Sequence, residues 1–139
     1  MELMATLALL AILVGFAIPA YNGYSDRARV NGAIAEIGRV TLELHAWRTN
    51  NGGAFPDTLA AAGIAMDPDP WGRAYVYEDV ATAGGGVLRT FGGVVVNTEF
   101  DLYSLGADGA SAVSLNDATS QDDIVLVRDG AFLGLAEEL

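Results

Sequence analysis

The sequence predicts an α+β fold in which one long N-terminal helix, apolar in its first half and amphipathic in its second, packs on a small antiparallel sheet. Two observations support this prediction. An uncharged run near the start of the chain continues into a helical pattern, and the remainder alternates between short β-like segments and turn signals. The chain has 139 residues, of which 52% are hydrophobic, so it suits one domain and is not a disordered chain.

The uncharged run covers residues 3–18, where sixteen consecutive residues carry no charge. As a helix they would extend about 24 Å, slightly less than the ~30 Å hydrocarbon core of a bilayer. A secretory signal peptide would have basic residues ahead of such a run, whereas Glu2 precedes it here. We therefore expect residues 1–23 to form a hydrophobic, membrane-depth helix segment and residues 24–139 to form a soluble globular domain.

The helical pattern continues beyond the apolar run. Apolar residues recur every three or four positions from Val30 to Trp47, with charged residues between them, as in a helix that buries one face. The sequence Asn50-Asn51-Gly52-Gly53 ends the pattern. Pro19 lacks a backbone N–H, so the carbonyl of Gly15 loses its helical partner. The weakest part of this helix is therefore expected between residues 14 and 23.

The second half of the chain predicts the small sheet. Residues 55–63 read as a short helix with Asp57 as a candidate N-cap, and Asp129-Gly130 is typical of a tight hairpin turn. Segments rich in β-branched and aromatic residues alternate with turn residues. The expected strands cover residues 74–77, 87–91, 94–96, 100–103, 124–127 and 131–135.

The charge distribution narrows the range of functions. The net charge is −11, there is no cysteine, and His45 is the one histidine. Residues 67–139 carry thirteen acidic and three basic residues, a net charge of −10, which argues against a nucleic-acid-binding surface. The lack of cysteine excludes thiolate metal sites and thiol catalysis. No catalytic motif accompanies the carboxylates, so we expect no enzyme, whereas calcium is a cation that carboxylates can bind.

The N-terminal segment resembles that of a known family. Glu2-Leu3-Met4, the apolar run and Ala17-Ile18-Pro19-Ala20-Tyr21 are similar to the start of type IV pilins and type II secretion pseudopilins. In that family four residues precede the corresponding Glu, the first usually an N-methylated Phe released by prepilin peptidase; here Met1 does. The resemblance implies that Glu2 pairs with the N-terminal amine of a neighbouring subunit, since a lone carboxylate is costly to bury. Glu2 and Pro19 are the predicted assembly residues.

Two further motifs resemble those of the major pseudopilins of type II secretion systems. Residues 69–75 match their DPWG segment, and residues 100–109, followed by Asp122-Asp123-Ile124, match their calcium loop. Twelve residues, 110–121, separate the two parts of this loop here, more than in the family, and Asp117 within them is a further candidate ligand. The resemblance implies one bound calcium ion, with the predicted ligands Asp108, Asp122, Asp123, the carbonyl of Leu105 and Ser120.

By this resemblance the chain is a structural subunit of a helical pseudopilus that is stabilised by calcium and acts in protein secretion. Two alternatives stay open: the major pilin of a type IV pilus, and a membrane-anchored calcium-binding module that does not polymerise. The implied partners are further copies of the chain, minor pseudopilins, an inner-membrane assembly platform and the membrane, without nucleic acid. The implied location is the bacterial inner membrane, crossed once before assembly, and then a periplasmic or extracellular filament.

Overall fold

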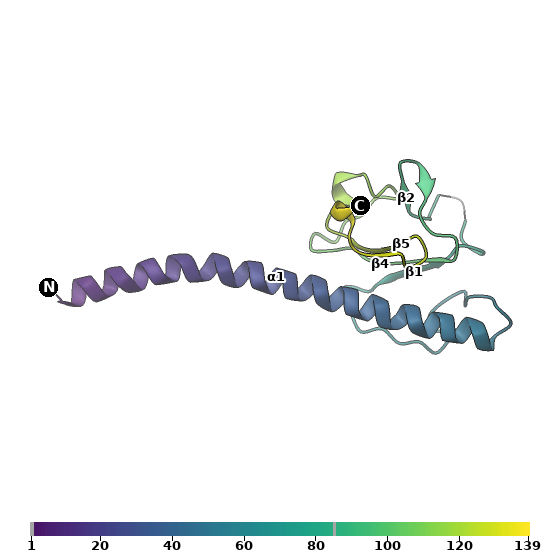
Figure 1. Ribbon diagram of the computed structural model, residues 1–139, viewed down its shortest axis with the longest axis horizontal. Helices are drawn as coiled ribbons and strands as arrows, with labels where there is room; N and C mark the ends of the chain where they lie inside the picture. Colours follow the sequence, from purple (N-terminus) through teal and green to yellow (C-terminus); the bar gives the residue numbers. More distant parts are fainter. Residues whose placement is uncertain (1, 85) are drawn as a thin grey trace.

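The computed structural model describes residues 2–84 and 86–139, and the side chains of Glu2 and Pro19 lie outside the part that it describes. The predicted α+β arrangement is confirmed: one long helix packs on a small antiparallel sheet (Figure 1). The elements in chain order are α1 (Glu2–Asn50), β1 (Val76–Asp79), β2 (Thr90–Phe91), β3 (Val94–Val95), β4 (Phe100–Ser104), η1 (Ala118–Ser120), β5 (Ile124–Val127), β6 (Phe132–Leu135) and η2 (Ala136–Glu138).

The main sheet has the order β1-β4-β5-β6, and all neighbouring strands are antiparallel. β5 and β6 are joined by residues 128–131, in which Arg128, Asp129 and Gly130 have φ values of 56°, 54° and 98° and the N–H of Ala131 donates to the carbonyl of Arg128 (3.2 Å). The predicted turn at Asp129-Gly130 is therefore present, but the connection is longer than a two-residue hairpin because Arg128, which precedes the turn, is also left-handed. A second hairpin pairs β2 with β3 across Gly92 and Gly93. It is shorter than expected, with two paired residues in each strand.

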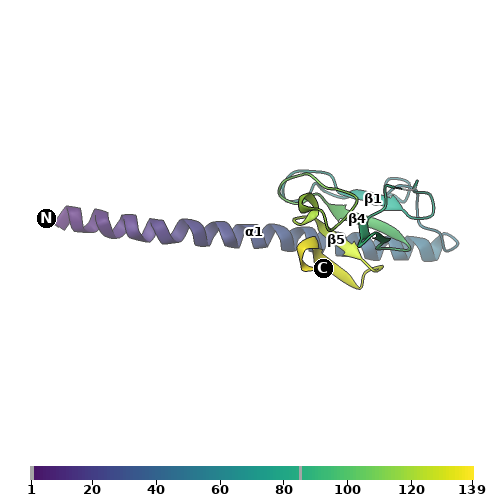
Figure 2. The same ribbon diagram turned by 90° about the horizontal axis from the view of Figure 1, so that it is seen from above.

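The C-terminal half of α1 lies against one face of the main sheet, as Figure 2 shows from above. Its buried stripe of Ala33, Ile37, Val40 and Leu44 is completely shielded from solvent. These residues pack on alternate residues of the two central strands, because side chains of a strand alternate between its faces. The strand residues in this core are Phe100, Leu102, Ile124 and Leu126.

The opposite face of the sheet has a smaller core. Tyr103, Val125 and Val127 pack there against Leu115, from the long loop before β5, and Ala136, from η2. The sheet is therefore covered by α1 on one face and by loops on the other. This second layer positions the region between β4 and β5, where the predicted calcium ligands lie.

The N-terminal half of α1 extends away from the domain as an isolated rod (Figure 1). It is long and apolar enough to cross a membrane. The described side chains between Leu3 and Tyr24 are all exposed, and Ser25 is the first that is partly buried. The helix is continuous from Glu2 to Asn50 in this single chain. The loss of helical structure expected near Pro19 concerns the assembled state and stays a prediction.

The helix ends where the sequence predicts, because the N–H of Gly53 donates to the carbonyl of Arg48 (2.9 Å) and Gly52 has a positive φ. The short helix expected over residues 55–63 is wrong. Successive turns replace it, with N–H groups donating to carbonyls three residues earlier, and the hydroxyl of Thr58 accepts from Ala61. A segment this short gains little from helical hydrogen bonds, so the packing of Phe55 and Leu59 on the core decides its path.

Candidate functional site

The predicted calcium loop begins where β4 ends. Gly106 has a φ of 61°, and a Cβ at this position would lie 2.1 Å from the carbonyl oxygen of Asp122. Glycine is therefore required twice, by the left-handed backbone and by the close approach of the chain returning to β5. This contact brings the two parts of the loop motif together, although residues 110–121 separate them in the sequence.

The segment at residues 69–75 is hydrogen-bonded to this loop. The guanidinium of Arg73 donates to the carbonyls of Gly106 (2.5 Å) and Ala107 (3.1 Å). Ser104, the last residue of β4, donates to the carboxylate of Asp69 (2.6 Å). The same carboxylate accepts from the N–H of Arg73 (2.8 Å) and so fixes its own turn. The two motifs that resemble those of pseudopilins thus form one structural unit.

Hydrogen bonds tie three of the predicted ligands, Leu105, Asp108 and Asp122, into the start of this loop. Oδ2 of Asp122 accepts from the N–H of Asp108 (2.9 Å), and Oδ1 of Asp108 accepts from the N–H of Ala110 (2.7 Å). The carbonyl of Leu105 accepts from the N–H of Gly109 (3.1 Å). These oxygens line one turn, and Asp108 is exposed to solvent.

Asp123 points elsewhere and is completely buried. Its Oδ2 accepts from the hydroxyl of Ser111 and lies 3.9 Å from Nη2 of Arg89. Its Oδ1 is enclosed and has no hydrogen-bond partner in the part of the chain that the structure describes. Burial raises the pKa of Asp123 to about 6, against the opposing effect of the Ser111 hydrogen bond.

The remaining candidates serve the fold of the long loop. Oγ of Ser120 accepts from the N–H of Ala112 (2.9 Å) and donates to its carbonyl (3.1 Å). Asp117 caps η1, because its Oδ1 accepts from the N–H and hydroxyl of Thr119, and the N–H bond lowers its pKa. Leu115 is fully buried. Residues 110–121 therefore have protein partners of their own.

These residues fit calcium in their chemistry, since carboxylate, carbonyl and hydroxyl oxygens are its usual ligands. The buried Oδ1 of Asp123 has no hydrogen-bond partner among the described residues, so binding a cation there would break no hydrogen bond. Among the residues that the structure describes, however, no three acidic or histidine side chains converge closely enough to hold a metal ion. Asp108 and Asp122 are neighbours, whereas Asp123 faces Arg89.

Sequence reasoning missed Arg89, which is 4% exposed and lies beside Asp123. The available signal was its isolation: it is the one basic residue between Arg73 and Arg128 in the acidic half of the chain. A lone charge inside an expected strand is a candidate for burial against an acidic partner.

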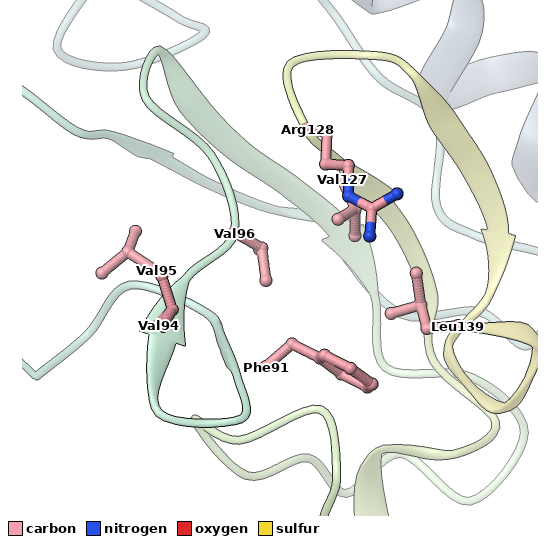
Figure 3. Close-up of a pocket in the computed structure, with 7 residues that line it drawn as sticks. All are labelled: Phe91, Val94, Val95, Val96, Val127, Arg128 and Leu139. Atoms are coloured by element: carbon pink, nitrogen blue, oxygen red, sulfur yellow. The ribbon is translucent and has the colours of Figure 1, made fainter.

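An apolar pocket of about 210 Å³ lies beyond the sheet, between the β2–β3 hairpin and the C-terminus (Figure 3). The lining side chains are apolar apart from Arg128, which is exposed. No carboxyl or imidazole side chain lines this pocket, so it lacks the acid–base groups that catalysis generally uses. Its lining residues are Phe91, Val94, Val95, Val96, Val127, Arg128 and Leu139.

Comparison with known proteins identifies the family of this chain. A fimbrial protein of Neisseria meningitidis is 32% identical over 135 aligned positions, which cover 88% of this chain and 78% of that protein. The chain belongs to the type IV pilin-like family. A type II secretion system core protein G of Pseudomonas aeruginosa is 28% identical over 138 aligned positions, covering 84% of this chain and 87% of that protein. A type IV major pilin protein of Neisseria gonorrhoeae is 34% identical over 98 positions, covering 70% and 53%.

No model of a protein family and no solved structure matches the chain. The relatives are pilins and a secretion core protein, which agrees with a structural protein rather than an enzyme. Within this pilin-like chain, the apolar N-terminal part of α1 fits a single-pass membrane anchor.

Proposed function

We propose that this pilin-like chain is the subunit of a helical filament of the type II secretion pseudopilus class, acting in protein secretion. One observation carries the proposal. The N-terminal half of α1 is apolar and uncovered on every side, while the same helix continues into a fully packed domain. Each large apolar side chain gains about 1.5–3 kcal/mol on burial, so this half is stable only in a membrane or against other helices.

The geometry suits a subunit that moves from one environment to the other. Before assembly the rod lies in the inner membrane, and in the filament the rods of many copies pack together. Because the rod is rigidly continuous with the buried stripe of α1, displacement of the helix carries the domain with it (Figure 1). An inner-membrane platform and minor pseudopilins are the further partners that this role requires.

The test is expression of the chain together with a type II secretion assembly platform, followed by negative-stain microscopy of sheared material. Thin filaments that contain the chain are the expected result. A chain that stays in the membrane under all conditions would instead be an anchored module that does not polymerise.

A type IV pilus subunit is the second candidate, because the meningococcal fimbrial protein matches as much of the chain as the secretion protein does. Deletion of the gene in its own host separates the two. Loss of an exported enzyme activity supports the secretion role, whereas loss of surface pili and twitching motility supports the pilus role.

We also propose that the loop after β4 binds one calcium ion. The supporting observations are the hydrogen bonds that tie Leu105, Asp108 and Asp122 into one loop and the buried Oδ1 of Asp123, which has no partner among the described residues. Ser120 would complete the ligand set through an oxygen. When bound, calcium supplies positive charge to a cluster of acidic side chains and so stabilises the loop.

Calorimetry on the full chain in detergent micelles tests the calcium site. Calcium should bind and raise the melting temperature, and Asp108→Ala or Asp123→Ala should remove most of that rise. Magnesium should substitute poorly, because it requires tighter octahedral geometry. An absence of binding at millimolar calcium would contradict this assignment, as would mutants that keep the full response.

A further inference from the structure

Arg89 is held in place by contacts from two separate segments, β4 and the long loop before β5. Its guanidinium lies over the ring of Tyr103 in β4, with Cζ 3.7 Å from the ring centroid. Nη1 donates to the carbonyl of Ala112 in the long loop. Its backbone N–H donates to Oδ2 of Asp101, also in β4 (2.7 Å). These contacts fix a cation inside the loop layer of the sheet, next to Asp123.

Two carboxylates face Arg89, and they differ in how they are satisfied. Asp101 accepts from the backbone of Arg89 and from the side-chain amide of Asn97 (2.8 Å), one bond on each oxygen. Asp123 accepts from the Ser111 hydroxyl on Oδ2, whereas its Oδ1 has no hydrogen-bond partner among the described residues. A buried carboxylate costs several kcal/mol unless a positive charge compensates it. For Asp123 the guanidinium, with Nη2 at 3.9 Å, is that charge.

We propose that Arg89 is the built-in counter-ion of Asp123. Its guanidinium holds the loop after β4 in its folded form and competes with calcium for the carboxylate of Asp123. The competition with calcium rests on the proposed calcium site. The counter-ion role does not, because it concerns two side chains of the chain itself. A cation that Asp123 coordinates would be a close neighbour of the guanidinium, and like charges repel each other.

The contacts of Arg89 explain why the long insertion, residues 110–121, can order around this pair. Ala112 receives the guanidinium, Ser111 donates to Asp123, and Ser120 closes the turn through Ala112. Thr90, next to Arg89, forms a parallel bridge with Ser114 of the insertion. The insertion therefore wraps the Arg89–Asp123 pair, and loss of either charge should loosen it.

A double-mutant cycle on the full chain in detergent micelles with a calcium chelator tests the counter-ion role. Arg89→Gln should lower the melting temperature by about 10 °C or more, because it leaves a buried charge uncompensated. In an Asp123→Asn background the same change should cost less than half as much. Arg128→Gln removes an equal charge from an exposed site and should shift the melting temperature by less than about 2 °C. Equal losses in both backgrounds would overturn the proposal.

Arg89→Lys keeps the result interpretable if Arg89→Gln fails to fold. Lysine retains the charge but loses the planar stack on Tyr103, so it should restore at least half of the stability that glutamine removes. Folding of the Arg89→Gln, Asp123→Asn double variant, where Arg89→Gln alone does not fold, also supports the proposal. A lysine variant no more stable than the glutamine variant would contradict it.

Calcium titration of the same variants tests the competition. Arg89→Gln should bind calcium at least about tenfold more tightly than the unmodified chain and should gain more melting temperature from it. If both chains bind equally, the competition is wrong. If neither binds calcium, the proposed calcium site and the competition fail together, while the double-mutant cycle still decides the counter-ion role.

Discussion

The two halves of α1 are one continuous helix in opposite surroundings. In the first half Leu3 is 79% exposed and Phe16 is 77% exposed, although both are large and apolar. In the second half Ile37 and Leu44 are completely buried. The backbone is helical in both, so secondary structure does not distinguish them; what covers the side chains does.

This difference shows where folding of the chain stops. The second half exposes polar residues on one side and buries an apolar stripe, so the sheet completes it within one chain. The first half is apolar all round, and none of the described elements of the domain reaches it (Figures 1 and 2). The surroundings that would cover it are the membrane and the further copies of the chain proposed above.

The largest effect in this comparison of the two halves of α1 is expected from substitution of Glu2, the charged residue at the start of the exposed, apolar half. Glu2→Leu should still insert into the membrane but should form few or no filaments, since removing one partner of a buried charge pair costs roughly 3–5 kcal/mol. Asp26→Asn, which changes an exposed acid where the helix enters the domain, should assemble normally. Filament yield by microscopy measures both, and a normal yield from Glu2→Leu would refute the pairing.

The next test makes the same substitution, isoleucine to alanine, once in each half of α1. Ile37→Ala should lower the free energy of unfolding of the domain by about 2–5 kcal/mol, because it leaves a cavity in the core. Ile12→Ala, at a position that is 58% exposed, should leave that free energy unchanged. Denaturant unfolding in micelles, followed by the fluorescence of Trp47 and Trp71, gives both values. Similar losses in the two variants would mean that the halves are not independent.

A smaller, local effect is expected at Pro19. In the assembled filament the helix should lose regular hydrogen bonding between Gly15 and Ala20, because proline donates no N–H and neighbouring helices can satisfy the freed groups. Pro19→Ala should restore a continuous helix there. A filament map that shows unbroken helical bonding from residue 12 to residue 24 in the unmodified chain would disprove this.

The smallest effect is expected at Asp129, in the turn between β5 and β6. Burial acts to raise the pKa of Asp129, but hydrogen bonds from Thr98 and from the N–H of Glu99 outweigh it and lower the pKa overall. A lowered pKa adds stability above the ordinary value, and this stability is lost as the pH falls through the native pKa.

Asp129→Asn, which removes the charge and tolerates the positive φ of this position, should therefore cost about 1 kcal/mol at pH 7, a modest value because the site is exposed. The cost should shrink as the pH falls below about 4. Unfolding curves between pH 3 and pH 7 measure it, and filament yield should not change. A cost that grows toward acid pH would reverse the sign argued here.

Much of the fold was predictable because its signals are local. The helix end at Gly52-Gly53 and the turn at Asp129-Gly130 follow from glycine geometry and from side-chain periodicity. The short helix over residues 55–63 failed because its apolar residues pack individually on the core instead of along one helical face. The calcium ligands were proposed from a family resemblance, and they stay a prediction.

The sequence by itself determined that the first half of α1 needs an apolar surrounding, since it carries an uncharged run of sixteen residues. That this surrounding is not supplied by the described part of the chain was decided by the tertiary structure. The sequence also predicted the positions of the strands, although β1 lies two residues later than expected and β2 covers only the end of its expected range, and most of the turns. Only the tertiary structure decided which partners the charged side chains of the C-terminal half have. Asp69 meets Ser104, Arg73 meets Gly106, and Arg89 meets Asp123. These contacts join residues 33–35 positions apart because sheet pairing brings distant strands together, and hydrophobic periodicity carries no information about such pairs.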